Sequence, residues 1–304
     1  MSVLICGSLA FDTITAFPGR FADQILPEQL HILNTSFLVP TLRREFGGCA
    51  GNIAYTLKAL GGEPVVMATV GVDGGGYLER LRDLGIDTGL VRSVSDSHTA
   101  QAIIITDRDN NQITAFHPGA MQAAHLTPVP PRADIRLAII APDGRDAMIS
   151  HAAQLAAAQI PFIFDPGQGL PMFDGAELLR FVDQASWVAV NDYEGRMLQE
   201  RTGLSAAEIS RRAHIRGVIV TLGAAGCELW IGGQSQRVPG VAATAVLDPT
   251  GCGDAFRGAL LYGLERGWDL ARCAELGNRI GAIKIATAGV QNHRLDPAAL
   301  GLAP

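Results

Sequence analysis

Short apolar runs alternate with helical patterns along most of the chain, and this alternation limits the choice of fold more than any other feature. Strand-like runs lie at residues 3–6, 137–141, 162–164, 187–190 and 218–222. A run that is apolar at every position predicts a strand buried on both faces of a parallel sheet. Helical spacing of apolar residues predicts helices at 50–60, 145–158, 192–202, 254–266 and 270–286. We therefore predict an α/β fold with a central, mostly parallel sheet between two helical layers.

Two regions depart from this alternation and predict a small β-structure beside the main sheet. Residues 99–106 and 112–117 flank the polar cluster 107–111, which is typical of a hairpin. Residues 37–46, with a partner at 12–17, predict a second strand pair. Neither pair is long enough to be stable alone. We expect a β-lid of about residues 12–17, 35–46 and 99–118, inserted in one domain that spans residues 1–304.

Charge and cysteine content exclude several classes of function. The chain has 24 Lys plus Arg against 30 Asp plus Glu, a net charge of -6, and no basic stretch, which argues against a broad nucleic-acid surface. Its 5 cysteines are odd in number and never in CxxC spacing, which argues against a disulfide framework or a zinc site. No run approaches the roughly 18 apolar residues of a membrane span, and the N-terminus lacks a basic signal-peptide region. We expect a cytoplasmic protein without nucleic-acid or membrane partners.

Lysine is scarce, and this also limits the mechanism. Only Lys58 and Lys284 occur, and neither belongs to a Walker P-loop. Ala282-Ile283-Lys284 imitates a protein-kinase strand, but the segments that should follow it are missing, so we interpret it as coincidence. Any phosphate must therefore be held without a P-loop lysine.

The most informative stretch is Val246 to Gly267, VLDPTGCGDAFRGALLYGLERG. A β-like run ends at Asp248, a glycine-rich turn follows, and a helix begins near Asp254. Gly251 and Gly253 leave successive backbone N–H groups at the helix N-terminus, which favours a bound anion. Asp254 by itself is typical of a capping residue or one that complements the helix dipole. Beside an anion site it is also suited to accept a proton from a hydroxyl that attacks phosphorus.

A second glycine-rich element, Glu45 to Gly62, again leads from an extended segment into a helix. Gly47, Gly48 and Gly51 permit close approach of a ligand to the backbone, and Asn52 offers a donor and an acceptor. An Asn-capped glycine turn is the simpler interpretation of this element alone. Two such elements in one chain favour a ligand site.

Two weaker signals lie between these elements. Asn191 and Glu194 lie at the start of a predicted helix. They form either a capping box or an outer-sphere magnesium site. Thr221, Gly223 and Gly226 lie where a strand meets a turn, as nucleotide contacts or as part of a plain strand–turn–strand unit.

The two glycine elements together resemble the signatures of a known family. GGCAGN at 47–52 and DPTGCGDAFRGALL at 248–261 are similar to those of the ribokinase-like carbohydrate kinases, the phosphofructokinase-B family. Further segments resemble bacterial nucleoside kinases of the adenosine kinase type: 7–12, 36–55, 110–121, 164–171 and 190–194. The resemblance implies a ribokinase-like three-layer sandwich with a β-lid, and transfer of the ATP γ-phosphate to a primary hydroxyl in purine salvage.

The resemblance also implies a role for each matching residue. Asp254 would be the base for the 5′-hydroxyl, and the backbone of Gly251, Cys252 and Gly253 the anion hole. Asp12, Gly48 and Asn52 would hold ribose hydroxyls, and Ser8, Phe116 and Gln168 would flank the base. ATP would contact Asn191, Thr221, Gly223 and Gly226, with Glu194 organising Mg²⁺ through water. Asp248, the main chain at Thr250 and the 289–291 turn resemble the monovalent cation (K⁺) site of some members.

The identity of the acceptor stays open between a nucleoside and a free or phosphorylated sugar. Arg43 and Arg44 in the lid either face solvent or clamp a phosphorylated sugar. Phe11, Phe37, Phe46 and Phe116 lie in lid or mouth segments and favour a flat base, with Phe116 as the strongest candidate. A nucleotide-binding protein without catalysis is a further alternative, against which the presence of Asp254 argues.

Two further expectations concern assembly and reactivity. Pairing of lid edges between two chains would give a homodimer. The Cys252 thiol, at a helix N-terminus, is either reactive through a lowered pKa or simply buried.

Overall fold

The computed structural model describes residues 1–25, 32, 34–109 and 111–302. Strands of the larger sheet are β1 (Ser2–Cys6), β4 (Pro64–Val70), β5 (Asp87–Ser93), β8 (Ile135–Ile140), β9 (Phe162–Phe164), β10 (Trp187–Asn191), β11 (Gly217–Thr221), β12 (Gly226–Ile231) and β13 (Gln234–Pro239). Their order is β13-β12-β11-β10-β9-β8-β1-β4-β5. From β5 to β11 all neighbours are parallel, and only β12 and β13 are antiparallel additions. The predicted mostly parallel sheet is confirmed.

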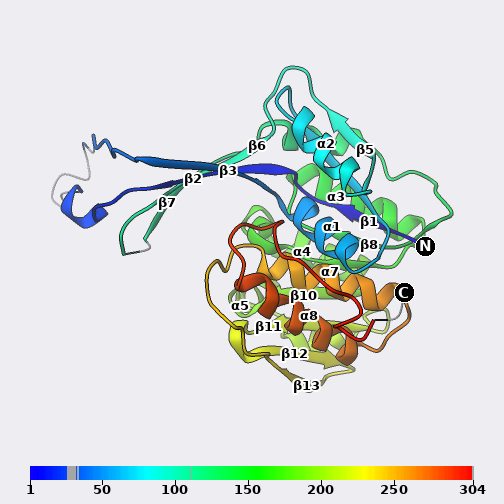
Figure 1. The fold of residues 1–304 in the computed structure, drawn as a ribbon. Coiled ribbons are helices and arrows are strands. Elements are labelled where there is room, and N and C mark those ends of the chain that lie inside the picture. The colour runs from blue at the N-terminus through cyan, green and yellow to red at the C-terminus, as the bar shows by residue number, and fades with distance from the viewer. Residues whose placement is uncertain (26–31, 33, 110, 303–304) are drawn as a thin grey trace.

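Helices cover both faces of this sheet (Figure 1). They are α1 (Cys49–Ala59), α2 (Gly75–Asp83), α3 (Arg145–Ala157), α4 (Gly175–Gln184), α5 (Asp192–Thr202), α6 (Ala206–Ser210), α7 (Cys252–Glu265) and α8 (Leu270–Ile285). One apolar core joins the sheet to α1, α2, α7 and α8, and the other joins it to α3, α4, α5 and α6. Alternate residues of β1 enter opposite cores, Val3 and Ile5 one, Leu4 and Cys6 the other, because side chains alternate along a strand.

A second sheet of four strands projects from the body as a long arm (Figure 1). Its strands are β2 (Ala10–Ala16), β3 (Thr41–Gly47), β6 (Ala100–Thr106) and β7 (Gln112–His117), in the order β3-β2-β6-β7. We call this sheet the lid. The predicted hairpin and the predicted pairing of 12–17 with 37–46 both lie in it. The hairpin turn includes Asn110, which lies outside the described residues.

Two of the differences from the expected element boundaries have a clear physical reason. The lid strand predicted at 37–46 begins only at Thr41, which pairs with Ala16. Pro40 precedes it and has no N–H to donate to a ladder. The helix expected from 254 begins at Cys252, because Gly251 is its N-cap in the left-handed conformation at φ 77°. None of the described helices is long and apolar enough to cross a membrane.

Candidate active site

A cavity of about 760 Å³ lies where the lid meets the carboxyl ends of the parallel strands. This edge is where open α/β sheets bind ligands, because loops diverge there. Fourteen of the residues singled out from the sequence line the cavity: Ser8, Asp12, Gly48, Asn52, Phe116, Gln168, Asn191, Glu194, Thr221, Gly223, Thr250, Gly251, Gly253 and Asp254. Cys252, Gly226 and Asp248 do not line it.

Asp254 lies in the first turn of α7, at the floor of the cavity. Burial raises the pKa of its carboxyl to about 7, while a hydrogen bond from Asn52 acts in the opposite direction. Nδ2 of Asn52 donates to Oδ2 of Asp254 over 2.8 Å, although the two residues are 202 positions apart. A carboxylate with a pKa near neutrality is matched to proton transfer at physiological pH.

The Asn52 amide is oriented by a second side chain that sequence analysis did not select for this role. Nε2 of Gln291 donates to Oδ1 of Asn52 over 3.1 Å and to the Tyr77 hydroxyl over 2.7 Å. The Tyr77 hydroxyl in turn donates to the carbonyl of Gly47. Because Gln291 occupies the amide oxygen, the Asn52 NH₂ group is directed at Asp254.

Backbone donors surround the same carboxylate. Within the described residues, the N–H groups of Gly251, Gly253 and Asp254 have no protein acceptor, as is usual for the first turn of a helix. The Cys252 N–H was predicted to belong to the anion hole, but it is not free, because it donates to the carbonyl of Pro249 over 3.2 Å. The remaining donors and the α7 dipole favour a bound anion at this point.

A buried ion pair lies beside Asp254 and was missed from the sequence. Nε and Nη2 of Arg257 donate to Asp165 over 3.0 and 3.2 Å, and both side chains are 5% exposed. Both residues line the cavity. Arg257 is one helical turn after Asp254, and its positive charge acts to lower the pKa of Asp254. The sequence offered only the places of these residues in the segments 248–261 and 164–171, and no local pattern pairs Arg257 with Asp165, which follows β9.

The lid contributes one face of its sheet to the cavity. Asp12, Ala102 and Phe116 lie side by side on neighbouring strands, because Asp12 pairs with Ala102 and Ala102 with Phe116. Ile104 and Thr114 form the next cross-strand pair and also line the cavity. Phe116 is 51% exposed, so its ring is accessible to a ligand. Burial raises the pKa of Asp12 to about 6, and the nearby Glu45 carboxylate adds to this shift.

The other aromatic residues considered for this role lie elsewhere. Phe11 and Phe46 pack with Tyr77 at the base of the lid. Phe37 contacts Phe17 and Phe21. Of the four candidates, the structure brings only Phe116 to the cavity.

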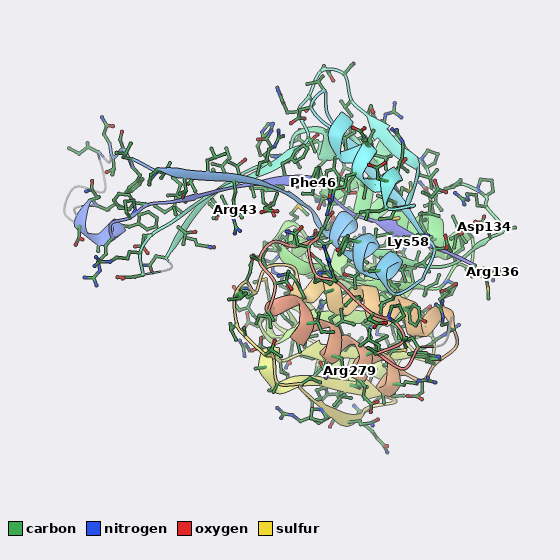
Figure 2. The ribbon with its side chains drawn as sticks, in the orientation of Figure 1. Arg43, Phe46, Lys58, Asp134, Arg136 and Arg279 are labelled. Carbon is green, nitrogen blue, oxygen red and sulfur yellow. The ribbon has the colours of Figure 1, made fainter. Side chains whose placement is uncertain are left out.

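The two lid arginines also lie outside the cavity lining. Arg44 bonds Asp73 over 2.8 Å and lies over the Phe11 ring. Arg43 lies 3.9 Å from Glu45 on the protruding strand β3 (Figure 2). Neither is placed to clamp a phosphorylated sugar in this structure.

The candidate nucleotide end of the cavity is built from β10, α5 and the β11–β12 turn. Asn191 and Glu194 form the capping box of α5, and both also line the cavity. Burial raises the pKa of Glu194. β11 and β12 form the plain strand–turn–strand unit that was the alternative interpretation. Gly226 lies in this turn with a φ of 91°. A side chain would not fit there, because a Cβ would lie 2.2 Å from the Val238 carbonyl oxygen.

Cys252 does not have the lowered pKa that a helix N-terminus can produce. Burial raises the pKa of its thiol, and the Asp248 and Asp254 carboxylates add to this effect, so the lowering by Lys284 is outweighed. The side chain also lies outside the cavity lining. All 5 cysteines are free thiols.

Asp248 lies in the loop before α7 and does not line the cavity. Its carboxylate accepts the Thr250 and Gly289 N–H groups, each over 3.0 Å. Its carbonyl accepts a hydrogen bond from the Lys284 ammonium over 2.8 Å. These contacts join the loop before α7 to the end of α8.

Comparison with known proteins shows the family of the chain. The sequence pattern of the pfkB family carbohydrate kinases matches residues 19–297. The chain belongs to this family. It is therefore a phosphotransferase that acts on a hydroxyl group, with the ribokinase fold.

Several relatives in this family are nucleoside kinases. The chain is 30% identical over 282 residues to a nucleoside kinase of Methanocaldococcus jannaschii, covering 92% of this chain and 90% of that protein. The structure of the Burkholderia thailandensis nucleoside kinase in complex with inosine has a TM-score of 0.88 at 50% identity, covering 97% of this chain and 94% of that one. The same enzyme in complex with ADP-inosine has a TM-score of 0.85 at 51% identity, covering 97% of this chain and 92% of that one.

Proposed function

We propose that this enzyme is an ATP-dependent nucleoside kinase that phosphorylates the 5′-hydroxyl of adenosine, inosine or another ribonucleoside. The observation that carries this proposal is one continuous cavity with Asp254 and the free N–H groups at its floor and Phe116 on its lid wall. A nucleoside has the same two ends, a primary hydroxyl on the sugar and a flat ring that stacks on an aromatic side chain. The 50% identity to a nucleoside kinase described in complex with inosine supports it.

The side chains divide the reaction between them. Asp254 accepts the proton of the attacking hydroxyl, while Asn52 holds the carboxylate in place. The N–H groups of Gly251, Gly253 and Asp254 stabilise the negative charge on the transferred phosphoryl group. Asp12, Gly48 and Asn52 bind the sugar hydroxyls, and Ser8, Phe116 and Gln168 enclose the base.

The opposite end of the cavity binds ATP. Asn191, Thr221 and Gly223 are its contacts in this proposal, and Gly226 shapes the turn that carries Gly223. The Glu194 carboxylate suits Mg²⁺, which keeps several waters and takes its other ligands from phosphates. Bound there, Mg²⁺ neutralises phosphate charge.

We further propose that the enzyme works in purine salvage in the cytoplasm. Five free cysteines are consistent with a reducing compartment. A homodimer through the lid completes the proposal, because the lid has edge strands at β3 and β7 and exposed apolar side chains on the face away from the cavity.

A sugar kinase is the alternative function within the same family. Its support is the curated relatives of that kind, such as a ribokinase of Mus musculus that is 26% identical over 271 residues. The lining of the lid favours the nucleoside, because a free sugar has no flat aromatic base to stack on Phe116.

The test is an assay of ADP release with Mg-ATP and adenosine, inosine, cytidine, ribose, fructose or fructose 6-phosphate. We expect higher kcat/KM for nucleosides than for any sugar. Phe116→Ala should raise the KM for nucleoside far more than the KM for ATP. Better turnover of ribose, unaffected by Phe116→Ala, would overturn the nucleoside assignment.

A further inference from the structure

Lys284 is completely buried, which is exceptional for a lysine. It lies in the last turn of α8, and its Nζ donates to the carbonyl of Asp248 over 2.8 Å and to that of Thr287 over 3.3 Å. Thr287 follows α8, whereas Asp248 begins the loop that leads to Gly251 and α7. The ammonium group therefore joins two segments that are 36 residues apart.

A lysine in the last turn of a helix commonly interacts with the carbonyls of its own helix end. Lys284 differs from that pattern, because its shorter contact is to the distant loop. A second contact joins the same two segments, because the Asp248 carboxylate accepts the Gly289 N–H. The buried ammonium and the carboxylate thus bind the same two segments together.

These segments contact the residues of the proposed anion hole and hold them in position. Gly251 lies against Val290, and a Cβ at Gly251 would lie 3.0 Å from a Val290 methyl carbon. The next residue, Gln291, orients the Asn52 amide toward Asp254. A shift of the Asp248 loop relative to the 289–291 turn would move both the backbone donors and Asn52.

The residues at this place do not fit a separate potassium ion. A potassium ion in a protein is bound by a shell of oxygen atoms, mainly carbonyls. The Asp248 carbonyl already accepts a hydrogen bond from the chain's own ammonium group, and both carboxylate oxygens of Asp248 accept N–H groups. An added cation would also meet the positive charge of Lys284 at close range, which is unfavourable in a buried site.

We propose that the Lys284 ammonium is a built-in monovalent cation, which fixes the anion-hole loop against the end of α8 and makes the enzyme independent of potassium. Potassium and ammonium carry the same charge and both bind carbonyl oxygens. A covalently attached ammonium supplies these contacts permanently. The kinetic test of this inference rests on the proposed function, because it measures phosphoryl transfer.

The first experiment measures kcat and KM of the unmodified enzyme in sodium, potassium and tetramethylammonium chloride at constant ionic strength. We expect equal values in all three salts. The thermal unfolding midpoint should likewise be the same in sodium and potassium. Activation by potassium relative to sodium would overturn the proposal.

The second experiment removes the ammonium with Lys284→Ala, which leaves room for an ion. Two partly buried carbonyls lose their charged donor, so we expect kcat in sodium to fall by about tenfold or more. Potassium or ammonium ions should restore activity and raise the unfolding midpoint, while tetramethylammonium should do neither. Lys58→Met is the matched control, because Lys58 is the other lysine of the chain and bonds Glu63 at the surface (Figure 2).

The outcomes separate this inference from the proposed function. A folded Lys284→Ala variant with full activity in sodium overturns the inference, and so does a loss that neither ion reverses. If the variant does not fold in sodium, its folding in potassium or ammonium supports the inference, and failure to fold in either overturns it. Absence of nucleoside phosphorylation by the unmodified enzyme would overturn the proposed function, whereas the thermal measurements would still test Lys284.

Discussion

The proposed chemistry of this protein depends on a carboxylate whose neighbours come from distant parts of the chain. Asp254 is in α7, Asn52 in α1, and Gln291 in the turn after α8. The hydrogen bonds from Gln291 to Asn52 and from Asn52 to Asp254 fix the direction of each amide. At the residue scale, the proposed function therefore rests on a chain of hydrogen bonds rather than on Asp254 alone.

Replacing the proposed base tests whether the protein is a catalyst. Asp254→Asn keeps the size of the side chain and removes its ability to accept the proton. We expect kcat to fall by about 10²- to 10⁴-fold, the usual contribution of a positioned base. ATP affinity, measured by calorimetry, should stay the same. Unchanged turnover would remove Asp254 from this role.

The pH dependence follows from the same group. Burial raises the pKa of Asp254 to about 7, and only the ionised form accepts a proton. We expect kcat/KM for nucleoside to rise tenfold per pH unit below about pH 7 and to level off above it. In Asn52→Ala the midpoint should move to higher pH, because the hydrogen bond that lowers this pKa is lost. A profile with the same midpoint in both proteins would contradict the proposed contact.

At the scale of single elements, the position of α1 depends on a glycine that no larger residue can replace without a backbone collision. Gly48 is the N-cap of α1 at φ 85°, and a Cβ there would lie 2.5 Å from the Ser8 carbonyl oxygen and 2.6 Å from the Ala10 nitrogen. Both are backbone atoms of the link between β1 and the lid. The close approach brings the start of α1 to the cavity.

Gly61, just after α1, offers a matched control for this position. Its φ is 88°, but a Cβ at this residue would have no other atom within 4 Å. Gly61→Ala should therefore cost only the left-handed backbone strain, about 1 kcal/mol of unfolding free energy. Gly48→Ala carries the same strain plus the backbone collision, and we expect about 3 kcal/mol or more. Urea denaturation measures both, and equal losses would contradict this account.

At the scale of the whole molecule, the lid has two faces with different surroundings. One face carries Asp12, Ile104 and Phe116 toward the cavity. The opposite face carries Leu42, Ile103 and Ile113, which are 68%, 45% and 41% exposed. Exposed apolar side chains on a projecting sheet are typical of a surface that another chain covers.

The proposed homodimer can be tested on that outer face. Ile103→Asp places a charge in the proposed interface, and we expect light scattering to report a monomer where the unmodified protein is a dimer. Ile231→Asp is the control, since Ile231 is 48% exposed at the end of β12 in the larger sheet. A monomeric unmodified protein, or a dimer that survives Ile103→Asp, would contradict the lid interface.

Local sequence patterns were enough to predict the layered α/β architecture, the lid strands and the glycine elements. Continuous apolar runs, helical spacing and turn glycines are local patterns, and the forces that they report act within one element. β4 has the same continuous apolar pattern as the predicted strands, and nothing in its sequence explains why it was not predicted. β13 was missed because it is a largely exposed, polar edge strand.

The contacts between these elements became visible only in the folded chain. The Asp165–Arg257 pair, the Gln291–Asn52–Asp254 contacts and the Lys284–Asp248 bond join residues 36 to 239 positions apart. The direction of a pKa shift also depends on burial, which is why the Cys252 thiol has a raised pKa although its place at a helix N-terminus favours a lowered one. Hydrogen bonding and burial are set by which elements pack together, and no local pattern carries that information.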